Sequence, residues 1–559
     1  MPDRVVDYLV RELAERGITH IFGVDGANIE DLYDAIFDAD GHPAGIVAKH
    51  EFSAATMADG YARATGGLGV VAATSGGGAM NLVAGLAEAY ASRVPVLALI
   101  GQPPTALEGA GAFQDSSGLA ESIDARALFA TVSRYCARVT DASAFPTQLA
   151  TAITAAEAGG PAVLLLPKDV QQQHLSPPIH RATEGPTHAG GDGRFGSASL
   201  AAQRFAAEMD RAGTLVVIAG DQVARDNARP ALAEFVSALG ASIGLAPDAK
   251  DVYANTGPGY LGVAGSMGHP ELLDALGSAS ACLLIGTRLP VTTRAGLESA
   301  LADLPLLSIG TLPPHLPATH LTSTDLATTL TELLPHLPHT RTPPPAREPT
   351  PLPVPESDGP GLRYRTVVEA IQTALPDGTD VFADAGNTGA SVVHHLRVPD
   401  GGRFVVALGM GGMGYAFGAG IGSAFARRDG PRRTVVVAGD GAFFMHGMEI
   451  HTAVEYDLPI TFVVFNNNAH AMCVTREQLF YRDRYSFNRF RPAHIGAGIA
   501  AMFPGLVTHT VEDAADLTEA LRRGMATPGP SFLEILCDPD EIPPFHPFLS
   551  TIESARRTS

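Results

Sequence analysis

The 559-residue sequence predicts an α/β protein of three doubly wound domains, each built on a parallel sheet. The first reason is length, because a single hydrophobic core rarely extends beyond about 250–300 residues. The second is that short runs of Val, Ile, Leu and Ala alternate with amphipathic stretches, as in parallel strands covered by helices. The third is that two segments rich in Pro, Gly and polar residues, 171–197 and 336–361, interrupt this alternation and indicate linkers.

These interruptions define the expected domains. The N-terminal domain is predicted over 1–172, the middle domain over 195–335 and the C-terminal domain over 362–540, with a Pro-rich linker at 336–361 and a tail at 541–559. The predicted strands include 45–50, 69–74, 95–101 and 161–167 in the first domain, 214–220 and 281–287 in the second, and 381–386, 434–440, 460–466 and 531–536 in the third. Sheets of this type bind ligands at the carboxyl ends of their strands.

Composition narrows the choice of partners and compartment. The 38 basic and 59 acidic side chains give a net charge of −21, which disfavours nucleic acid and anionic membranes. The chain has no apolar run of about 20 residues, and charges interrupt its N-terminus, so we expect a cytoplasmic protein. The four cysteines lie far apart without a C-x-x-C pair, which indicates core thiols rather than a zinc site or a disulfide framework.

Polar side chains stand at the ends of two apolar strands in the third domain. Asp440 follows the run 434–439, and Asn467 follows the run 460–465, 27 residues after Asp440. One strand–helix–strand crossover needs about that length, so both oxygens should project from neighbouring strand ends. A carboxylate, an amide oxygen and a nearby backbone carbonyl suit Mg²⁺, while Gly441 and the helix after it offer free N–H groups to a phosphate. Metal and phosphate together indicate a diphosphate cofactor.

The stretch from Gly-Asp-Gly (439–441) to the Asn pair resembles the cofactor motif of thiamine diphosphate enzymes. Three N-terminal stretches, "ITHIFGVDGANIEDLYDAI" (18–36), "KHEFSAATMADGYARATG" (49–66) and "AFQDSSG" (112–118), resemble the pyrimidine-binding domain of the acetolactate synthase and related decarboxylase group. "GGMGYAFGAGIGSAFA" (411–426) is similar to the start of that group's diphosphate-binding domain. The resemblance covers nearly the whole chain and implies the order pyrimidine-binding, middle and diphosphate-binding domain.

The resemblance implies a cofactor site drawn from both outer domains. Mg²⁺ would be held by the Asp440 and Asn467 side chains and by the Ala469 carbonyl. Met413 would bend the cofactor and the Gly411 carbonyl would accept from its 4′-amino group. The other implied cofactor contacts are Gly26, Thr74 and Asn81 in the N-terminal domain, and Ala385, Gly386, Asn387, Thr388, Gly439, Gly441, Ala442, His470, Ala471 and Met472 in the C-terminal domain.

Catalytic roles are also implied by the resemblance. Glu51 would bind the pyrimidine nitrogen of the cofactor and thereby activate it, and Phe113 and Gln114 would border the substrate. In this group the pyrimidine domain of one subunit faces the diphosphate domain of another, so a homodimer or homotetramer is expected. Small-molecule substrates, a 2-oxo acid donor and a carbonyl acceptor, are the expected partners.

Three functions follow from these residues. The first is a carboligase that decarboxylates a 2-oxo acid, with pyruvate the expected donor, and adds the acyl unit to a second carbonyl compound. The second is a simple 2-oxo acid decarboxylase that releases an aldehyde. The third, a noncatalytic structural subunit, conflicts with the presence of Glu51, Asp440 and Asn467. Phe113 and Gln114 match the carboligases, and no pair of adjacent histidines of the decarboxylase type stands near 99–104, so the first function is favoured.

Several positions depart from the acetolactate synthase pattern. Asp25 replaces a common Pro, the loop 75–81 lacks its usual Pro, and Ala471 replaces a Gly. Asp115 stands where a Glu is usual, and Arg476 where a Trp faces the substrate channel; a solvated helix charge is the alternative for Arg476. The stretch 286–294 resembles the arginine-bearing turn of the flavin-binding domain, but its surroundings are shorter, so FAD is not expected. These departures concern the substrate rather than the cofactor.

Overall fold

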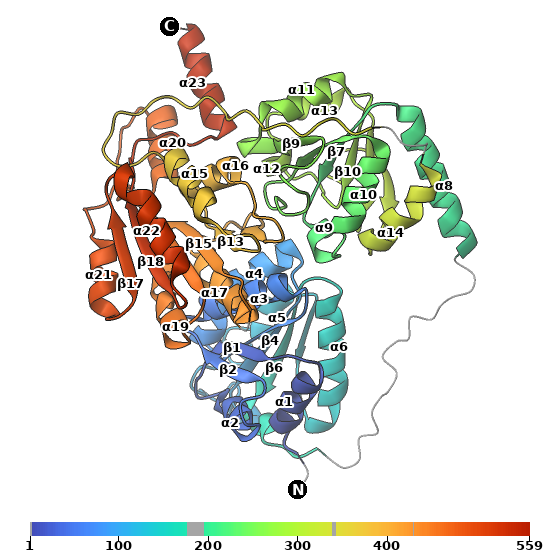
Figure 1. Cartoon of the computed structure of the whole chain (residues 1–559). Coiled ribbons are helices and arrows are strands. Elements are labelled where there is room, and N and C mark those ends of the chain that lie inside the picture. The colour runs from blue at the N-terminus through green and yellow to red at the C-terminus, as the bar shows by residue number, and fades with distance from the viewer. Residues whose placement is uncertain (1–2, 176–194, 338–341, 429, 559) are drawn as a thin grey trace.

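A computed structural model describes residues 3–175, 195–337, 342–428 and 430–558. It contains three six-stranded sheets, all with parallel pairing and flanked by helices, which confirms the predicted fold class. Figure 1 shows the N-terminal sheet in blue and cyan, the middle sheet in green, and the C-terminal sheet in orange and red. No helix in the described part of the chain is both long and apolar enough to cross a membrane.

The N-terminal sheet has the strand order β2-β1-β3-β4-β6-β5. Its strands are β1 (His20–Val24), β2 (Ala44–Val47), β3 (Gly69–Ala73), β4 (Val96–Gln102), β5 (Tyr135–Arg138) and β6 (Pro161–Pro167). Its helices are α1 (Val5–Glu15), α2 (Glu30–Asp38), α3 (Glu51–Thr65), α4 (Gly77–Ser92), α5 (Ala125–Ala130), α6 (Phe145–Glu157) and α7 (Lys168–Gln171). The buried strands β3, β4 and β6 are continuous apolar runs, as parallel strands covered on both faces must be.

The middle sheet has the strand order β12-β11-β10-β7-β8-β9. Its strands are β7 (Leu215–Ala219), β8 (Ser242–Leu245), β9 (Tyr260–Val263), β10 (Ala281–Ile285), β11 (Leu306–Gly310) and β12 (Thr319–Thr322). Its helices are α8 (Phe195–Ala212), α9 (Gln222–Arg225), α10 (Arg229–Leu239), α11 (Pro270–Ser278), α12 (Val291–Arg294), α13 (Glu298–Ala302) and α14 (Leu326–Leu333). A short 3₁₀ helix, η3 (Gly265–Met267), follows β9 and reaches the C-terminal domain, where it contacts α16.

The C-terminal sheet has the order β14-β13-β15-β16-β18-β17, the same arrangement as the N-terminal sheet. Its strands are β13 (Asp380–Ala383), β14 (Phe404–Val406), β15 (Thr434–Gly439), β16 (Ile460–Asn466), β17 (Val507–Val511) and β18 (Ser531–Leu536). Its helices are α15 (Tyr364–Ala374), α16 (Gly386–His395), α17 (Tyr415–Arg427), α18 (Asp440–His446), α19 (Ile450–Glu455), α20 (Ala471–Tyr481), α21 (Ile495–Met502), α22 (Ala514–Ala526) and α23 (His546–Thr558). Strand β14 lies on one side of β13 in the sheet, and β15 and β16 lie on the other side. The switch point therefore lies between β13 and β15, where such sheets bind ligands.

One hydrophobic core joins the two outer domains. It runs from Phe22 and Phe52 in the N-terminal domain to Phe417 and Phe462 in the C-terminal domain. At its centre α3 lies along α17, and both helices are mostly buried. The middle domain has its own core around β7, β8 and β10.

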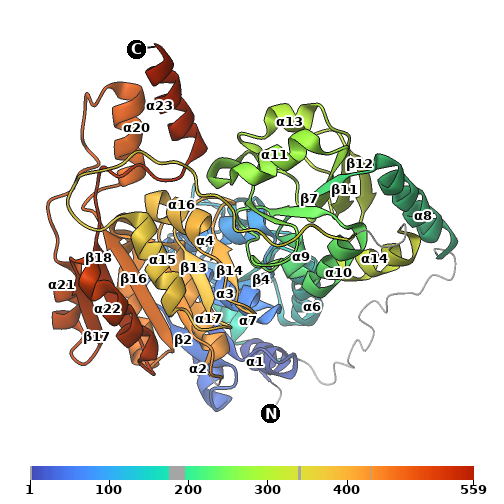
Figure 2. The same ribbon diagram turned by 45° about the horizontal axis from the view of Figure 1, so that its top comes forward.

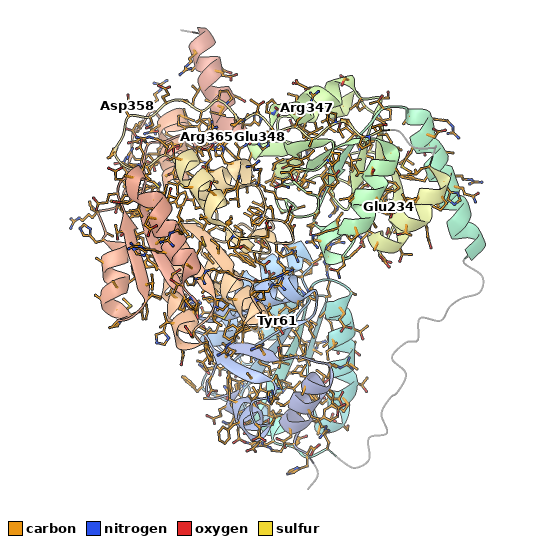
Figure 3. All side chains as sticks on the ribbon, viewed as in Figure 1. Tyr61, Glu234, Arg347, Glu348, Asp358 and Arg365 are labelled. Carbon is orange, nitrogen blue, oxygen red and sulfur yellow. The ribbon has the colours of Figure 1, made fainter. Side chains whose placement is uncertain are left out.

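The described part of the predicted Pro-rich linker, 342–361, contains neither helix nor strand. Figure 3 shows Arg347 and Glu348 at the start of this segment and Asp358 near its end, beside the C-terminal domain. Its backbone and side chains bind both neighbours: Thr350 N donates to Glu271 of the middle domain at 2.7 Å, and Ser357 Oγ donates to Asp538. The segment therefore holds the two domains together as well as connecting them.

Two other predicted segments need comment. The predicted tail 541–559 contains α23, which packs against α20, and Figures 1 and 2 show the two helices side by side. The predicted linker 171–197 falls largely on 176–194, which lie outside the described residues. Of the cysteines, Cys282 and Cys537 are buried as expected, but Cys136 and Cys473 are only half-buried, and Cys473 lines a cavity at the edge of the C-terminal sheet.

Candidate active site

A cavity of about 390 Å³ opens at the carboxyl edge of the C-terminal sheet. Its walls come from the chain that follows β13, from the loop after β14, and from the segments that follow β15 and β16. Ser266, Met267 and Thr292 of the middle domain form a further part of the wall. The cavity therefore lies at the switch point of the sheet, between the C-terminal and middle domains.

Asp440 and Asn467 meet at one side of this cavity. Strands β15 and β16 pair in parallel with Gly439 opposite Phe465, so the residues that follow each strand become neighbours. The backbone N–H of Ala469 donates to both side chains, at 3.2 Å to Asp440 Oδ2 and at 3.0 Å to Asn467 Oδ1. The Asn467 amide nitrogen donates to the hydroxyl of Tyr364 at 2.7 Å, so its oxygen is the atom directed to Asp440.

The three consecutive asparagines serve different purposes. Asn466 lies on the other side of β16, where its amide nitrogen donates to Glu534 at 2.7 Å. Asn468 holds the following loop, since its side-chain oxygen accepts from Ala493 N at 2.9 Å. Of the three, only Asn467 lines the cavity.

Two carboxylates in the cavity wall are buried and form no ion pair with a basic side chain among the described residues. Burial raises the pKa of Asp440 to about 7, although the backbone N–H of Gly441 donates to it at 3.0 Å. Burial likewise raises the pKa of Asp384, which accepts from the backbone N–H groups of Gly414 at 3.0 Å and Ala416 at 2.9 Å. Asp384 thus fixes the start of α17, whereas Asp440 retains acceptor capacity towards the cavity.

The N-terminal end of α16 forms a second part of the wall. Gly386 has φ +85°, a left-handed conformation that favours glycine and turns the chain from β13 into the helix. The Asn387 side-chain oxygen is buried and has no hydrogen-bond partner among the described residues, while its nitrogen donates to Glu541 O at 3.3 Å. All fifteen predicted C-terminal contacts line this cavity: Ala385, Gly386, Asn387, Thr388, Gly411, Met413, Gly439, Asp440, Gly441, Ala442, Asn467, Ala469, His470, Ala471 and Met472.

The predicted N-terminal residues form a separate cluster. Glu51 is the first residue of α3, and Asn81 Nδ2 donates to its Oε2 at 2.9 Å. Thr74 Oγ1 donates to Gln114 Oε1 at 3.2 Å. A Cβ on Gly26 would lie 2.8 Å from Thr74 Cβ, so this loop also lies against the cluster.

The two groups of predicted residues do not share a cavity within one chain. Neither Glu51 nor Gln114 lines the cavity that contains Asp440. Phe113 points away from the protein and is 76% exposed. The predicted residues therefore form two separate clusters in one chain, which we call the N-terminal half-site (Gly26, Glu51, Thr74, Asn81 and Gln114) and the C-terminal half-site (the predicted residues around Asp440) after the role predicted for them.

The sequence did not single out Glu88 on α4, which is buried. Its carboxylate accepts from three consecutive backbone N–H groups of the loop after β14: Gly409 at 3.1 Å, Met410 at 2.6 Å and Gly411 at 3.3 Å. No local pattern marks this glutamate, since α4 reads as an ordinary helix and its partner loop lies more than 300 residues away. Asp384 stands at a predicted strand end and could have been found from that position.

Two of the sequence departures have visible local roles. Asp115 accepts from the backbone N–H groups of Gly109 at 2.7 Å and Ser117 at 3.0 Å, so it holds its own loop. Arg476 lines the cavity of the C-terminal half-site.

A second cavity, about 300 Å³, lies at the carboxyl edge of the middle sheet and is lined by Asp221, Gln222, Thr287 and Arg288, among others. The absence of FAD from the middle domain stays a prediction.

Three family models match consecutive parts of the chain. Residues 3–121 match the N-terminal TPP binding domain of thiamine pyrophosphate enzymes, 202–337 their central domain and 384–535 their C-terminal TPP binding domain. Thiamine pyrophosphate (TPP) is another name for thiamine diphosphate.

Individual relatives agree with these matches. The chain is 27% identical to the acetolactate synthase of Arthrospira platensis, over 95% of this chain and 94% of the relative. It is also 27% identical to the acetolactate synthase isozyme 2 large subunit of Escherichia coli K12, over 86% of each chain. A solved structure from Mycobacterium smegmatis, assigned to the thiamin diphosphate-dependent enzymes, has the same fold with a TM-score of 0.80 at 22% identity, over 96% of this chain and 99% of that one.

The order of the three matched domains, the cavity at the switch point and the full-length relatives lead to one conclusion. The chain belongs to the thiamine diphosphate-dependent enzymes, and the full-length relatives to which it is similar are acetolactate synthases.

Proposed function

We propose that this enzyme uses thiamine diphosphate and Mg²⁺ to decarboxylate a 2-oxo acid, with pyruvate as the donor, and to join the acyl unit to a second carbonyl compound. The observation that supports this proposal most is the pair of half-sites, each with the polar groups that one half of the cofactor requires. The acetolactate synthase relatives favour carbon–carbon ligation as the outcome.

The C-terminal half-site fits a diphosphate bound with a divalent cation. The unpaired oxygen of Asn387 is a buried polar atom of the kind that a polar ligand or an ordered water satisfies. Asp440 is 1% exposed and has backbone N–H donors but no basic partner in the part of the chain that the structure describes, so a cation beside it would offset the cost of burying its charge. The free N–H groups at the start of α18 and α16 suit phosphate oxygens.

The donor set favours Mg²⁺ over softer metals. The described residues contain no group of three or more His, Cys, Asp or Glu that could hold a metal, so a cation at Asp440 needs amide and carbonyl oxygens as well. Asn467 Oδ1 and the Ala469 carbonyl supply such oxygens, and hard oxygen ligands are the preference of Mg²⁺. We propose Asp440, Asn467 and Ala469 as its protein ligands.

Thiamine diphosphate, when bound, supplies the electron sink that makes decarboxylation of a 2-oxo acid possible. The protein must then position the cofactor and move a proton at its pyrimidine ring. We assign this proton transfer at the pyrimidine ring to the carboxyl group of Glu51. Asn81 orients that group by a 2.9 Å hydrogen bond. The carbonyl of Gly411 would accept from the pyrimidine amino group, and Met413 would set the bend of the cofactor.

The separation of the half-sites supports a dimer as the smallest active unit. Glu51 must reach the same cofactor that Asp440 holds, yet it does not line the cavity of Asp440 in its own chain. In a symmetric pair, the N-terminal half-site of each subunit can complete the C-terminal half-site of the other. A homotetramer would contain two such pairs.

Gln114 supports ligation rather than aldehyde release. Its side-chain oxygen already accepts from Thr74, so its N–H groups are the ones that could donate to the carbonyl or carboxylate of an acceptor. An amide holds the acceptor without being acidic enough to protonate the acyl unit. Whether the enzyme forms a ligated ketone or an aldehyde then depends on whether an acceptor carbonyl or a proton donor lies within about 3–3.5 Å of the reacting carbon.

The test is a product analysis with pyruvate and a panel of aldehydes and 2-oxo acids. We expect the wild-type enzyme to give mainly the ligated 2-hydroxy ketone, and Gln114→Ala to shift the product towards free acetaldehyde. Wild-type enzyme that releases acetaldehyde almost exclusively, even with saturating acceptors, would establish the decarboxylase function instead.

A further inference from the structure

One cationic side chain stands in the wall of the cofactor cavity. Arg476 lies on α20, which begins at Ala471, two residues after Ala469, whose N–H donates to Asp440. Met472, Cys473 and Arg476 are spaced by three and four residues, so they share one face of the helix, and all three line the cavity. Arg476 is the only Lys or Arg among the lining residues.

Arg476 has no ion-pair partner inside the described part of the chain, and its one recorded charge contact is with an aromatic ring. Its guanidinium lies 6.0 Å from the centre of the Phe548 ring on α23, and it forms no ion pair with a described acidic residue. Arg489 differs from Arg476 in this respect, because Arg489 pairs with Asp540, which also accepts from Gln478 at 2.9 Å. An unpaired, exposed arginine in a cavity wall is a ready site for an anion.

The position of Arg476 indicates which anion it would meet. Arg476 is five positions after Ala471, so its backbone stands about 7.5 Å further along the axis of α20 than the first residue of that helix. The C1 carboxylate of a 2-oxo acid is bonded directly to the reacting carbonyl carbon, so it must stay close to that carbon. A carboxylate at the far end of a substrate would extend along α20 towards Arg476, past the neutral Ser266 and Thr292 of the middle domain.

We propose that Arg476 binds a second, distal carboxylate of the acceptor, so that the acceptor is a dicarboxylic 2-oxo acid. The inference rests on the proposed carboligase function and specifies its substrate class. The C1–C2 bond of pyruvate breaks and releases CO₂. One carbon–carbon bond forms to the acceptor carbonyl carbon, and one proton from solvent goes to the acceptor oxygen, without any oxidant or reductant. An arginine fork on a carboxylate also offsets the repulsion that a net charge of −21 imposes on a dianion.

Matched acceptors isolate the distal carboxylate. 2-Oxoglutarate and 2-oxoadipate are compared with 2-oxovalerate and 2-oxohexanoate, which carry a methyl group in place of that carboxylate, each with saturating pyruvate. In at least one of the two pairs, we expect kcat/KM for the dicarboxylic acceptor to exceed kcat/KM for the monocarboxylic acceptor of the same chain length by ~10-fold or more. Arg476→Ala should bring this ratio close to one with little change for the monocarboxylates, and Arg476→Lys should keep part of it.

A second measurement separates this inference from the carboligase proposal. Glutarate and pentanoate contain no ketone, so they serve as inhibitors of CO₂ release from pyruvate whether or not ligation occurs. Wild-type enzyme should be inhibited at lower concentrations by glutarate, and Arg476→Ala should remove that preference. Arg523→Ala, which removes an exposed arginine from α22, is the matched control and should keep it.

The outcomes are distinct. Absence of ligation with every acceptor would contradict the proposed carboligase, while the inhibitor ratio would still decide the role of Arg476. Ratios that Arg476→Ala leaves unchanged would overturn the inference. An equal loss for monocarboxylates and dicarboxylates would also overturn it, because Arg476 would then bind the carboxylate that all 2-oxo acids share.

Discussion

Glu88 shows how a single buried residue shapes the cofactor cavity from another domain. Its two oxygens accept from the three backbone N–H groups of residues 409–411, and Ser92 Oγ donates to Oε1 at 2.9 Å. The loop that it holds ends at Gly411, which has φ +67° and lines the cavity. Because α4 belongs to the N-terminal domain, Glu88 also fixes that loop against the opposite half of the same chain.

Glu88→Gln should therefore weaken catalysis although Glu88 itself is not among the residues proposed to contact the cofactor. An amide keeps one acceptor oxygen and turns the other into a donor facing N–H groups, which should lower kcat by ~10- to 100-fold and raise the thiamine diphosphate concentration needed for half activity. Steady-state kinetics with titrated cofactor measures both quantities. Glu234→Gln, on the outer side of α10 in the middle domain (Figure 3), is the control and should behave as wild type. Equal kinetics for the two variants would contradict this role for Glu88.

Among single residues, the sequence identified those whose position at the end of a strand indicates a ligand site. Asp440 and Asn467 follow buried apolar runs at the spacing of one crossover, and their oxygens indeed share the N–H of Ala469. Glu88 could not be found in this way, because its partners are backbone groups of a distant loop, and nothing in a sequence records which backbone groups lack a partner.

Among the elements, the contact of α3 with α17 determines how closely the outer domains approach. Gly418 and Gly422 of α17 lie directly against the backbone of α3, and a Cβ on Gly422 would stand 2.0 Å from Met57 O. Gly60 returns the contact, since a Cβ there would stand 2.0 Å from Ala419 O. The glycine-rich stretch 411–426 thus serves helix packing as well as the cofactor cavity.

Gly422→Ala should destabilise the protein by about 2–4 kcal/mol, because the backbone of α3 cannot yield as a flexible side chain can. Chemical denaturation of the variant measures the change in the free energy of unfolding. The control is Gly498→Ala on the exposed side of α21, where a Cβ meets nothing within 4 Å. That substitution should raise the free energy of unfolding by about 0.5–1 kcal/mol. Two variants of equal stability would show that the helices are free to separate.

The sequence predicted central strands better than edge strands and termini. The apolar runs of β4, β6, β15 and β16 are fully or almost fully buried, so periodicity finds them. Edge strands such as β5 and β12 are only partly buried and carry mixed residues, so they leave no comparable signal. The helix α23 in the predicted tail is stabilised by its contact with α20, which composition alone does not reveal.

Over the whole molecule, a buried histidine cluster joins the middle domain, the connecting segment and the C-terminal domain. The ring of His394 on α16 stacks on His269 at 4.2 Å. His394 Nδ1 lies 2.9 Å from Met267 O, and Leu352 N donates to its Nε2 at 3.0 Å, so the ring is neutral and donates from Nδ1. Because Met267 lines the cofactor cavity, this cluster helps to hold the middle-domain wall of the site.

The cluster predicts a loss of stability in mild acid. Burial lowers the pKa of His394 to about 4, against about 6.5 in an unfolded chain. The unfolded state therefore takes up a proton first, and the stability that His394 contributes is complete above about pH 6.5 and falls towards pH 4. At pH 5 one such group costs about 2 kcal/mol. His394→Gln, which keeps a donor and an acceptor but cannot titrate, should reduce the drop in unfolding free energy between pH 7 and pH 5.

Chemical denaturation at the two pH values provides the measurement. His269 and His395, whose pKa values burial also lowers, and the buried Lys250 remain in the variant, so only part of the drop should disappear. His336→Gln, at an exposed position in the middle domain, should leave the drop unchanged. A His394→Gln protein with the full wild-type drop would show that the ring does not titrate as its burial requires.

The arrangement of the half-sites is the largest feature that the sequence could predict only through a resemblance. Residue patterns indicated the groups around Glu51 and around Asp440, but they do not predict how far apart these two groups lie in the folded chain. The structure places the two groups in different parts of one chain, and the account requires that a second chain unite them.

Complementation between inactive chains tests this central claim most directly. Glu51→Gln and Asp440→Ala chains are co-expressed with two different tags, and mixed pairs are isolated by successive purification on both tags. In each mixed pair one active site carries both lesions and the other carries none, so the preparation should recover about half of the wild-type activity with thiamine diphosphate and Mg²⁺. Mixed pairs as inactive as either parent would contradict the account, since every site would then be built from one chain alone.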